Sequence, residues 1–138
     1  MINRGICFDM DGTIIDSGPG SLQQIFRVAH LLNLPVTLEI EQQLRTRWGQ
    51  HLSNIIKVAW PGTDISQFYR QLEDLDITEP WPVFPGTKEA LEKLFVYYQL
   101  SILTNRNTRT AILQLEHNDL ARYFRIILTA DSTPYKKP

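Results

Sequence analysis

Short hydrophobic runs alternate with helical patterns along this chain. Residues 4–8 form an apolar run that ends abruptly at Asp9, and similar runs occupy residues 100–103 and 124–128. Apolar runs of this length, bounded by turn residues, are typical of buried strands. The order strand, helices, strand, helix, strand is expected for parallel βαβ units, because parallel strands need a crossover that a helix usually supplies. We therefore predict an α/β fold.

A long block between the first two predicted strands has apolar residues at helical spacing. The clearest example is residues 22–32, and the pattern returns in further segments before a proline-rich connection at residues 80–86. The whole block, residues 18–80, is too long for one crossover. We predict that it is an inserted helical cap over the carboxyl ends of the strands, and that residues 1–17 and 81–138 form the core.

Composition and charge narrow the class of protein. The 138 residues are 43% hydrophobic and 21% charged, as in globular domains. Lys and Arg total 14 against 15 Asp and Glu, so no broad cationic field attracts nucleic acid or an anionic membrane. No signal peptide is apparent, and no apolar run approaches the roughly 18 residues of a spanning helix. We expect a cytoplasmic protein without nucleic-acid or membrane partners, whose one cysteine, Cys7, is buried in a strand.

Two carboxylates follow the first predicted strand. Asp9 and Asp11 stand two positions apart where the chain leaves regular structure, so both side chains can point into one cavity. Two carboxylates that converge repel each other unless a cation or a shared proton offsets their charge. Gly12 allows a close backbone approach or a positive φ, and Thr13 adds a hydroxyl that can bind an anion. An ordinary Asp/Gly turn is the alternative for these residues alone.

The segment that contains these carboxylates resembles a family signature. Residues 8–17, Phe-Asp-Met-Asp-Gly-Thr-Ile-Ile-Asp-Ser, are similar to the first signature of haloacid dehalogenase-like phosphatases. In that family the first aspartate attacks phosphorus to give an aspartyl-phosphate, and the second protonates the leaving alcohol and later activates water. The resemblance implies these roles for Asp9 and Asp11. It also implies Mg²⁺, bound by the Asp9 carboxylate and the Asp11 main-chain carbonyl.

Two later segments resemble the second and third signatures of the same family. Thr104 and Asn105 close the second predicted strand and would hydrogen-bond the phosphoryl oxygens. Lys137 matches the catalytic lysine, whose charge would neutralise the nucleophile and the phosphoryl group. Taken singly, a strand that ends in Thr-Asn is more often a turn, and adjacent lysines at a chain end are more often a solvated tail. Their order after the first motif is what supports the resemblance.

Basic residues of the predicted cap form a further candidate group. Arg45, Arg47 and His51 surround a break between two predicted helices. This group is similar to the substrate-specificity loop of the family's small-capped members. A cationic side chain there would meet a carboxylate or a distal phosphate of the substrate. Solvated charges on helix faces are the alternative.

The family's fourth signature is missing from this chain. It consists of one or two acidic residues after a further strand, and the chain ends at Pro138 before such a strand. We therefore expect an incomplete core, weak magnesium binding and a fragment of a longer phosphatase. The missing strand normally lies beside the strand that precedes Asp9, so we also expect an open sheet edge that drives self-association into a homo-oligomer.

The resemblance implies a Rossmann-like three-layer core with a parallel sheet, a helical cap after the first strand and an incomplete C-terminal part. The activity it implies is hydrolysis of a small phosphorylated metabolite, such as 2-phosphoglycolate, compromised in this chain. A sugar-phosphate mutase similar to β-phosphoglucomutase shares all three motifs and is one alternative. A catalytically inactive remnant, with a binding or structural role, is the other.

Overall fold

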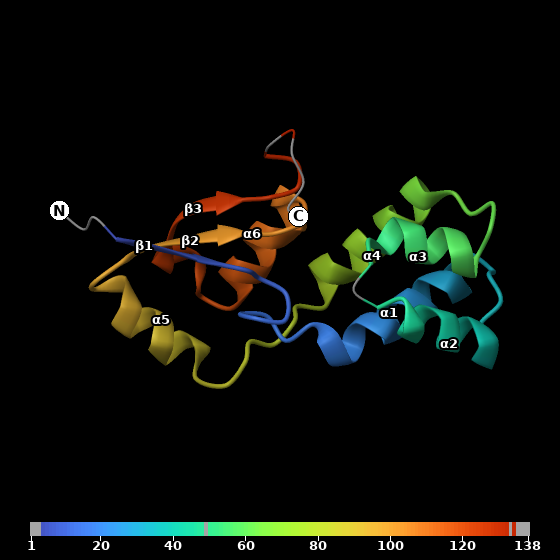
Figure 1. Cartoon of the computed structure of the whole chain (residues 1–138), viewed down its shortest axis with the longest axis horizontal. Coiled ribbons are helices and arrows are strands. Elements are labelled where there is room, and N and C mark those ends of the chain that lie inside the picture. Colours follow the sequence, from blue (N-terminus) through green and yellow to red (C-terminus); the bar gives the residue numbers. More distant parts are fainter. Residues whose placement is uncertain (1–3, 49, 133, 135–138) are drawn as a thin grey trace. The chain divides into compact units, whose positions relative to one another are not determined.

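The described residues fold into a parallel sheet with helices and a separate group of helices (Figure 1). The computed structural model describes residues 4–48, 50–132 and 134. In chain order the elements are β1 (Gly5–Phe8), α1 (Gly18–Leu31), α2 (Leu38–Thr46), α3 (Leu52–Ala59), α4 (Ile65–Thr78), α5 (Thr87–Phe95), β2 (Gln99–Leu103), α6 (Thr108–His117), the 3₁₀ helix η1 (Ala121–Tyr123) and β3 (Phe124–Leu128).

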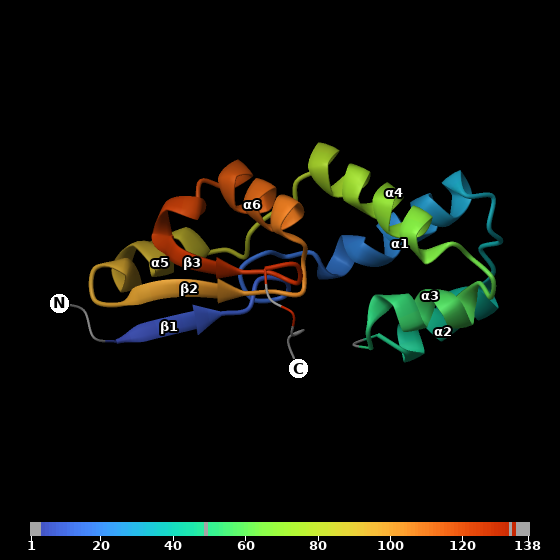
Figure 2. The same cartoon turned by 90° about the horizontal axis from the view of Figure 1, so that it is seen from above.

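The three strands form one parallel sheet in the order β1-β2-β3. Gly5 lies opposite Gln99, and Leu103 lies opposite Leu128, with one irregularity in the register at Leu100. The helices α5 and α6 provide the two crossovers, and all three strand arrows point the same way in Figure 2. The predicted parallel α/β fold is therefore confirmed. The carboxyl ends of the three strands lie side by side at one end of the sheet, where ligands of open α/β sheets bind.

The core of the sheet lies between the strands and the two crossover helices. Leu91 of α5 and Leu115 of α6 pack with Leu100 and Ile102 of β2, and all four are at most 2% exposed. Other side chains of the sheet point away from this cluster: Ile126 and Leu128 of β3 are 51% and 39% exposed.

The prediction that Cys7 is buried is wrong. Cys7 is exposed, whereas Ile6 and Phe8, its neighbours on β1, pack against the core cluster. Successive strand residues point to opposite faces of a sheet, so Cys7 points to the other face. The prediction assumed cover on both faces, but the helices that join the described core cluster cover one. Within the described residues β1 is an edge strand, and self-association through it stays a prediction that sedimentation would test.

The chain divides into two compact units, residues 1–18 with 76–138 and residues 19–75. The second unit is helical and has its own core, in which Trp60 stacks on the fully buried Phe68 with ring centroids 5.7 Å apart. The indole N–H of Trp60 donates to the carbonyl of Pro35 at 2.7 Å. A helical insertion after the first strand is thus confirmed. None of the helices among the described residues has both the length and the apolar character needed to cross a membrane.

Candidate active site

A tight turn directly after β1 presents the two aspartates. Met10 is completely buried, and its carbonyl accepts the N–H groups of Ile14 and Ile15, both at 2.9 Å. Gly12 has a φ of +77°, a conformation that side-chain-bearing residues rarely adopt. Because Met10 points into the core, Asp9 and Asp11 on either side of it are left at the surface of the turn. Asp9 is exposed, and its Oδ1 accepts the N–H of Met10 at 2.8 Å.

The carboxylate of Asp11 is held by two other segments of the chain. The hydroxyl of Ser17 donates to Oδ1 at 2.8 Å. Arg106, in the loop after β2, donates from Nη2 to Oδ1 at 2.7 Å and from Nε to Oδ2 at 2.8 Å. Two parallel bonds between a guanidinium and a carboxylate combine strong attraction with a fixed geometry. Asp11 is therefore oriented by the end of β2 as well as by its own turn.

Arg106 also forms an ion pair with Asp76 near the end of α4. The side chains of Arg106 and Asp76 are only 13% and 15% exposed, so both charges are largely withdrawn from water. Burial lowers the pKa of Arg106, but its hydrogen bonds and the charges of Asp11 and Asp76 outweigh burial and raise that pKa above its ordinary value. A charge buried to this degree is stable only when it is paired.

Thr104 also lies at the carboxyl ends of the strands, as its place directly after the second predicted strand indicates. Its side chain is 2% exposed, its N–H donates to the carbonyl of Leu128 at 2.9 Å, and its Oγ1 accepts the N–H of Arg106 at 3.1 Å. Thr104 and Asp11 are thus joined through Arg106. Asn105 and Thr13 are exposed.

The segment after β3 begins at a cluster of hydroxyl groups around Asp131. Thr108 donates to Asp131 Oδ1 from its N–H at 2.8 Å and from its hydroxyl at 2.6 Å, and the Thr129 hydroxyl donates to the same oxygen at 2.7 Å. These bonds connect the end of β3 to the first residue of α6. The predicted catalytic Lys137, further along this segment, lies outside the described residues.

The stability that Asp131 adds to this connection should depend on pH. The hydrogen bonds from Thr108 and then Thr129 lower the pKa of Asp131 from 3.8 to about 2. Its stabilising effect is therefore present above the unfolded-state pKa and is lost as the pH falls from about 4 toward 2. Urea unfolding should show Asp131→Asn to be less stable than wild type near pH 7, with the difference shrinking below about pH 4. A difference that stays constant down to about pH 2 would contradict this role.

The predicted specificity residues gather at the junction of α2 and α3, in the helical unit. Arg45 donates to Glu41 Oε1 from Nε at 2.9 Å and from Nη2 at 2.8 Å. Arg47 is the C-cap of α2, and His51, at the N-cap of α3, has Nδ1 2.8 Å from Ser53 Oγ. An exposed ion pair of this kind contributes little stability, so Arg45 can exchange Glu41 for another anion at small cost. Asp9, Asp11 and Thr104 belong to the other unit.

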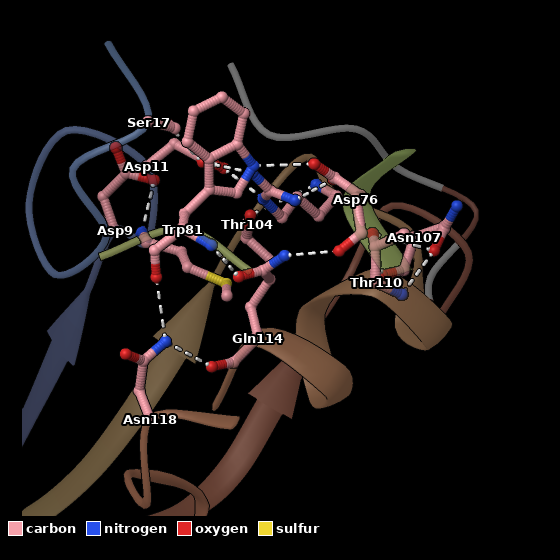
Figure 3. Close-up of polar contacts among 12 residues, drawn as sticks. Asp9, Asp11, Ser17, Asp76, Trp81, Thr104, Asn107, Thr110, Gln114 and Asn118 are labelled. Atoms are coloured by element: carbon pink, nitrogen blue, oxygen red, sulfur yellow. Dashed lines mark hydrogen bonds and ion pairs between the residues drawn. The ribbon is translucent and has the colours of Figure 1, made fainter. Parts of the chain in front are cut away.

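Sequence reasoning missed three residues that organise the site. Arg106 directly follows Thr104 and Asn105, so the sequence places a cation at the end of the strand next to the one that carries Asp9. This position could have indicated that Arg106 pairs with an aspartate of the site. Asp76 and Gln114 gave no comparable signal. Figure 3 shows how Asp76 is fixed: its Oδ1 accepts the indole N–H of Trp81 at 2.6 Å, and its carbonyl accepts Nε2 of Gln114 at 2.9 Å.

The chain is similar to known proteins along nearly its whole length. The sequence model for the haloacid dehalogenase-like hydrolases matches residues 6–138. The chain belongs to this family. A phosphoglycolate phosphatase of Salmonella typhimurium is 26% identical over 161 residues, which cover 98% of this chain. The chain spans 64% of that relative's length.

Solved structures of the family share the fold. The crystal structure of a predicted phosphoglycolate phosphatase from Haemophilus somnus is 26% identical, with a TM-score of 0.77, and the match covers 100% of this chain and 67% of that one. The HAD-hydrolase YfnB from Bacillus subtilis, bound to magnesium, is 20% identical with a TM-score of 0.70, covering 98% and 68%. The resemblance stated from the motifs, and the Rossmann-like core with a helical insertion, are confirmed.

Asp9 and Asp11 are the candidate ligands of a magnesium ion. Within the described part of the chain, no group of three or more His, Cys, Asp or Glu side chains could hold a metal. The Asp9 carboxylate and the Asp11 main-chain carbonyl are oxygen donors, the class that Mg²⁺ prefers. Because Arg106 engages both side-chain oxygens of Asp11, a main-chain contribution from that residue fits better than a carboxylate one. The donor set therefore fits Mg²⁺ but is smaller than a complete site.

Proposed function

We propose that this protein hydrolyses a small phosphomonoester and that Asp9 is its nucleophile. The observation that carries the proposal is the pair of aspartates at the carboxyl end of β1. Asp9 is exposed, while Asp11 is oriented by Ser17 and Arg106. An exposed carboxylate nucleophile, beside a second carboxylate held in place, is the arrangement that covalent catalysis with a separate acid and base requires. Membership of the hydrolase family supports the same reaction class.

The proposed reaction has two steps. In the first, a carboxylate oxygen of Asp9 attacks phosphorus, the bond from phosphorus to the alcohol oxygen breaks, and protonated Asp11 gives its proton to that oxygen. In the second, Asp11 takes a proton from water as the water oxygen attacks phosphorus. The bond between Asp9 and phosphorus then breaks, which releases inorganic phosphate and restores the Asp9 carboxylate.

The remaining motif residues are proposed to bind the phosphoryl group. Phosphoryl transfer depends mostly on positioning and on neutralising the oxygens of the transferred group. Gly12 and Thr13 follow the nucleophile in its turn, and Thr104 and Asn105 lie at the end of the neighbouring strand β2. Lys137 is proposed to add the positive charge, as the family resemblance implies.

Mg²⁺ is the proposed cofactor, held by the Asp9 carboxylate and the Asp11 main-chain carbonyl. When bound, it supplies positive charge against the phosphoryl oxygens. We expect removal of divalent ions by a chelator to abolish turnover, and added Mg²⁺ to restore it. Isothermal titration with Mg²⁺ provides a second readout, in which Asp9→Asn should weaken binding. Full turnover in the chelator would exclude this cofactor.

The proposed substrate is a small phosphorylated metabolite with a second anionic group, such as 2-phosphoglycolate. The Salmonella typhimurium relative is described as a phosphoglycolate phosphatase, and the Haemophilus somnus structure as a predicted one. Arg45, Arg47 and His51 are proposed to bind the second anionic group. A panel of phosphorylated metabolites tests this, because neutralising Arg45 or Arg47 should raise KM for 2-phosphoglycolate and leave KM for p-nitrophenyl phosphate unchanged.

Trapping of the covalent intermediate tests the proposed function directly. We expect acid quenching during turnover of 2-phosphoglycolate to leave a phosphoryl group on the peptide that contains Asp9, found by mass spectrometry. Inorganic phosphate should accumulate as the product. Transfer to an added sugar phosphate in preference to water would select the mutase alternative. A chain that forms no aspartyl-phosphate and releases no phosphate would support the inactive remnant.

A further inference from the structure

Arg106 joins two carboxylates that are far apart in the sequence. Its Nη2 and Nε donate to the two oxygens of Asp11 at 2.7 and 2.8 Å, and its Nη1 pairs with Asp76. A planar guanidinium that meets both oxygens of a carboxylate fixes the plane of that carboxylate as well as its distance. Arg106 thereby sets the orientation of the Asp11 side chain.

Arg106 is itself held firmly on both sides. Its N–H donates to Thr104 Oγ1 at 3.1 Å, and its carbonyl accepts the N–H of Ala130 at 2.9 Å. On the far side Asp76 is fixed by the indole of Trp81 at 2.6 Å (Figure 3). The orientation of Asp11 is therefore tied to the ends of β2 and β3 and to residues 76–81, which run from the last turn of α4 to Trp81.

The contacts of Asp11 leave room for proton transfer. Ser17 and Arg106 together donate three hydrogen bonds to its carboxylate. A carboxylate has about four lone-pair positions, so about one remains. That position can carry the proton that Asp11 gives to the leaving group, or accept the proton of the attacking water. Resting on the proposed phosphatase function, we propose that Arg106 is a positioning residue for the acid and base Asp11, and that Asp76 anchors Arg106 in this task.

This role makes a distinctive prediction about leaving groups. Loss of Arg106 removes two of the three hydrogen bonds to the Asp11 carboxylate, so its plane is no longer fixed, but Asp9 and the phosphoryl-binding residues stay in place. An alkyl alcohol needs a proton to leave, whereas p-nitrophenol leaves readily as an anion. A defect in positioning the acid should therefore slow turnover of alkyl phosphates far more than turnover of p-nitrophenyl phosphate, whereas a general structural defect should slow both equally.

The kinetic test compares Arg106→Gln with wild type on 2-phosphoglycolate and on p-nitrophenyl phosphate. We expect kcat for 2-phosphoglycolate to fall about tenfold with KM unchanged, and kcat for p-nitrophenyl phosphate to fall less than about threefold. Asp11→Asn should show the same selectivity with a larger loss. Arg106→Lys keeps the positive charge but lacks the planar guanidinium that binds both oxygens of Asp11, so it should recover part of kcat. Arg109→Gln, which removes an exposed arginine at the start of α6, is the matched control.

The alternative roles predict different results. A rise in KM for both substrates would assign Arg106 to phosphoryl binding, and an equal fall in kcat for both would assign it to folding; either result overturns the proposal. A ¹⁵N spectrum of the Arg106 Nε–H provides a readout independent of turnover. It should be protected from exchange with water in wild type and lose this protection in Asp11→Asn. An unprotected Nε–H signal in the wild type would also overturn the proposal. If the wild-type protein turned over neither substrate, the proposed phosphatase function would be refuted. The Nε–H signal would still show whether Arg106 contacts Asp11.

Discussion

Replacing Asp9 by asparagine should lower phosphomonoester turnover by about 10⁴-fold. The amide is nearly isosteric with the carboxylate but is a far weaker nucleophile, so the covalent step is lost while the shape of the site is kept. Initial rates with p-nitrophenyl phosphate and Mg²⁺ measure the effect. We expect no aspartyl-phosphate in the variant after acid quenching.

Two controls separate this loss from damage to the fold. Asp9 is exposed, so its replacement should change the free energy of unfolding by no more than about 0.5 kcal/mol. Asp74→Asn removes another exposed carboxylate, on α4, and should turn over substrate at the wild-type rate. If Asp9→Asn kept more than about a tenth of the wild-type activity, Asp9 would not be the nucleophile and the proposed mechanism would be wrong.

The strands were predictable because their signal is local. The apolar runs at residues 4–8, 100–103 and 124–128 correspond to β1, β2 and β3 within one residue at each end. Each run is short and ends at polar residues, so few other structures suit it. The helical insertion was predictable for a similar reason, since apolar residues at helical spacing must be buried on one side of a helix.

The polar contacts of the site were not predictable, because they join distant segments. Arg106 meets Asp11 across 95 positions of sequence and Asp76 across 30. A hydrophobic pattern states which face of an element is buried but not which charge faces which. The sequence therefore indicated the aspartates and Thr104 through their motifs, while Arg106 became apparent only from its contacts.

Replacing Gln114 by leucine should lower the free energy of unfolding by about 3 kcal/mol, although leucine has a similar volume. Gln114 is 1% exposed on α6, and its amide bonds to main-chain groups at both ends of residues 76–81. Its Oε1 accepts the N–H of Trp81 at 2.8 Å, and its Nε2 donates to the carbonyl of Asp76 at 2.9 Å. Leucine leaves both main-chain groups without these partners, and each unsatisfied buried group costs about 1–3 kcal/mol.

Urea unfolding of wild type, Gln114→Leu and Glu116→Leu measures this cost. Glu116 is an exposed residue of the same helix, so its replacement places the same side chain on α6 without removing a buried hydrogen bond. A Gln114→Leu variant as stable as Glu116→Leu would show that water replaces the lost partners, and that residues 76–81 are not fixed by this amide.

Gln114→Glu separates the contribution of the hydrogen bond that the amide accepts from that of the hydrogen bond it donates. Glutamate keeps the acceptor for the Trp81 N–H, but near pH 7 it places a charged oxygen against the carbonyl of Asp76. When protonated, it can donate to that carbonyl as glutamine does. Its deficit in stability relative to wild type should therefore be largest near neutral pH and shrink toward about pH 4. Because the same segment carries the Asp76 carboxylate that anchors Arg106, this variant should also weaken the protection of the Arg106 Nε–H near pH 7.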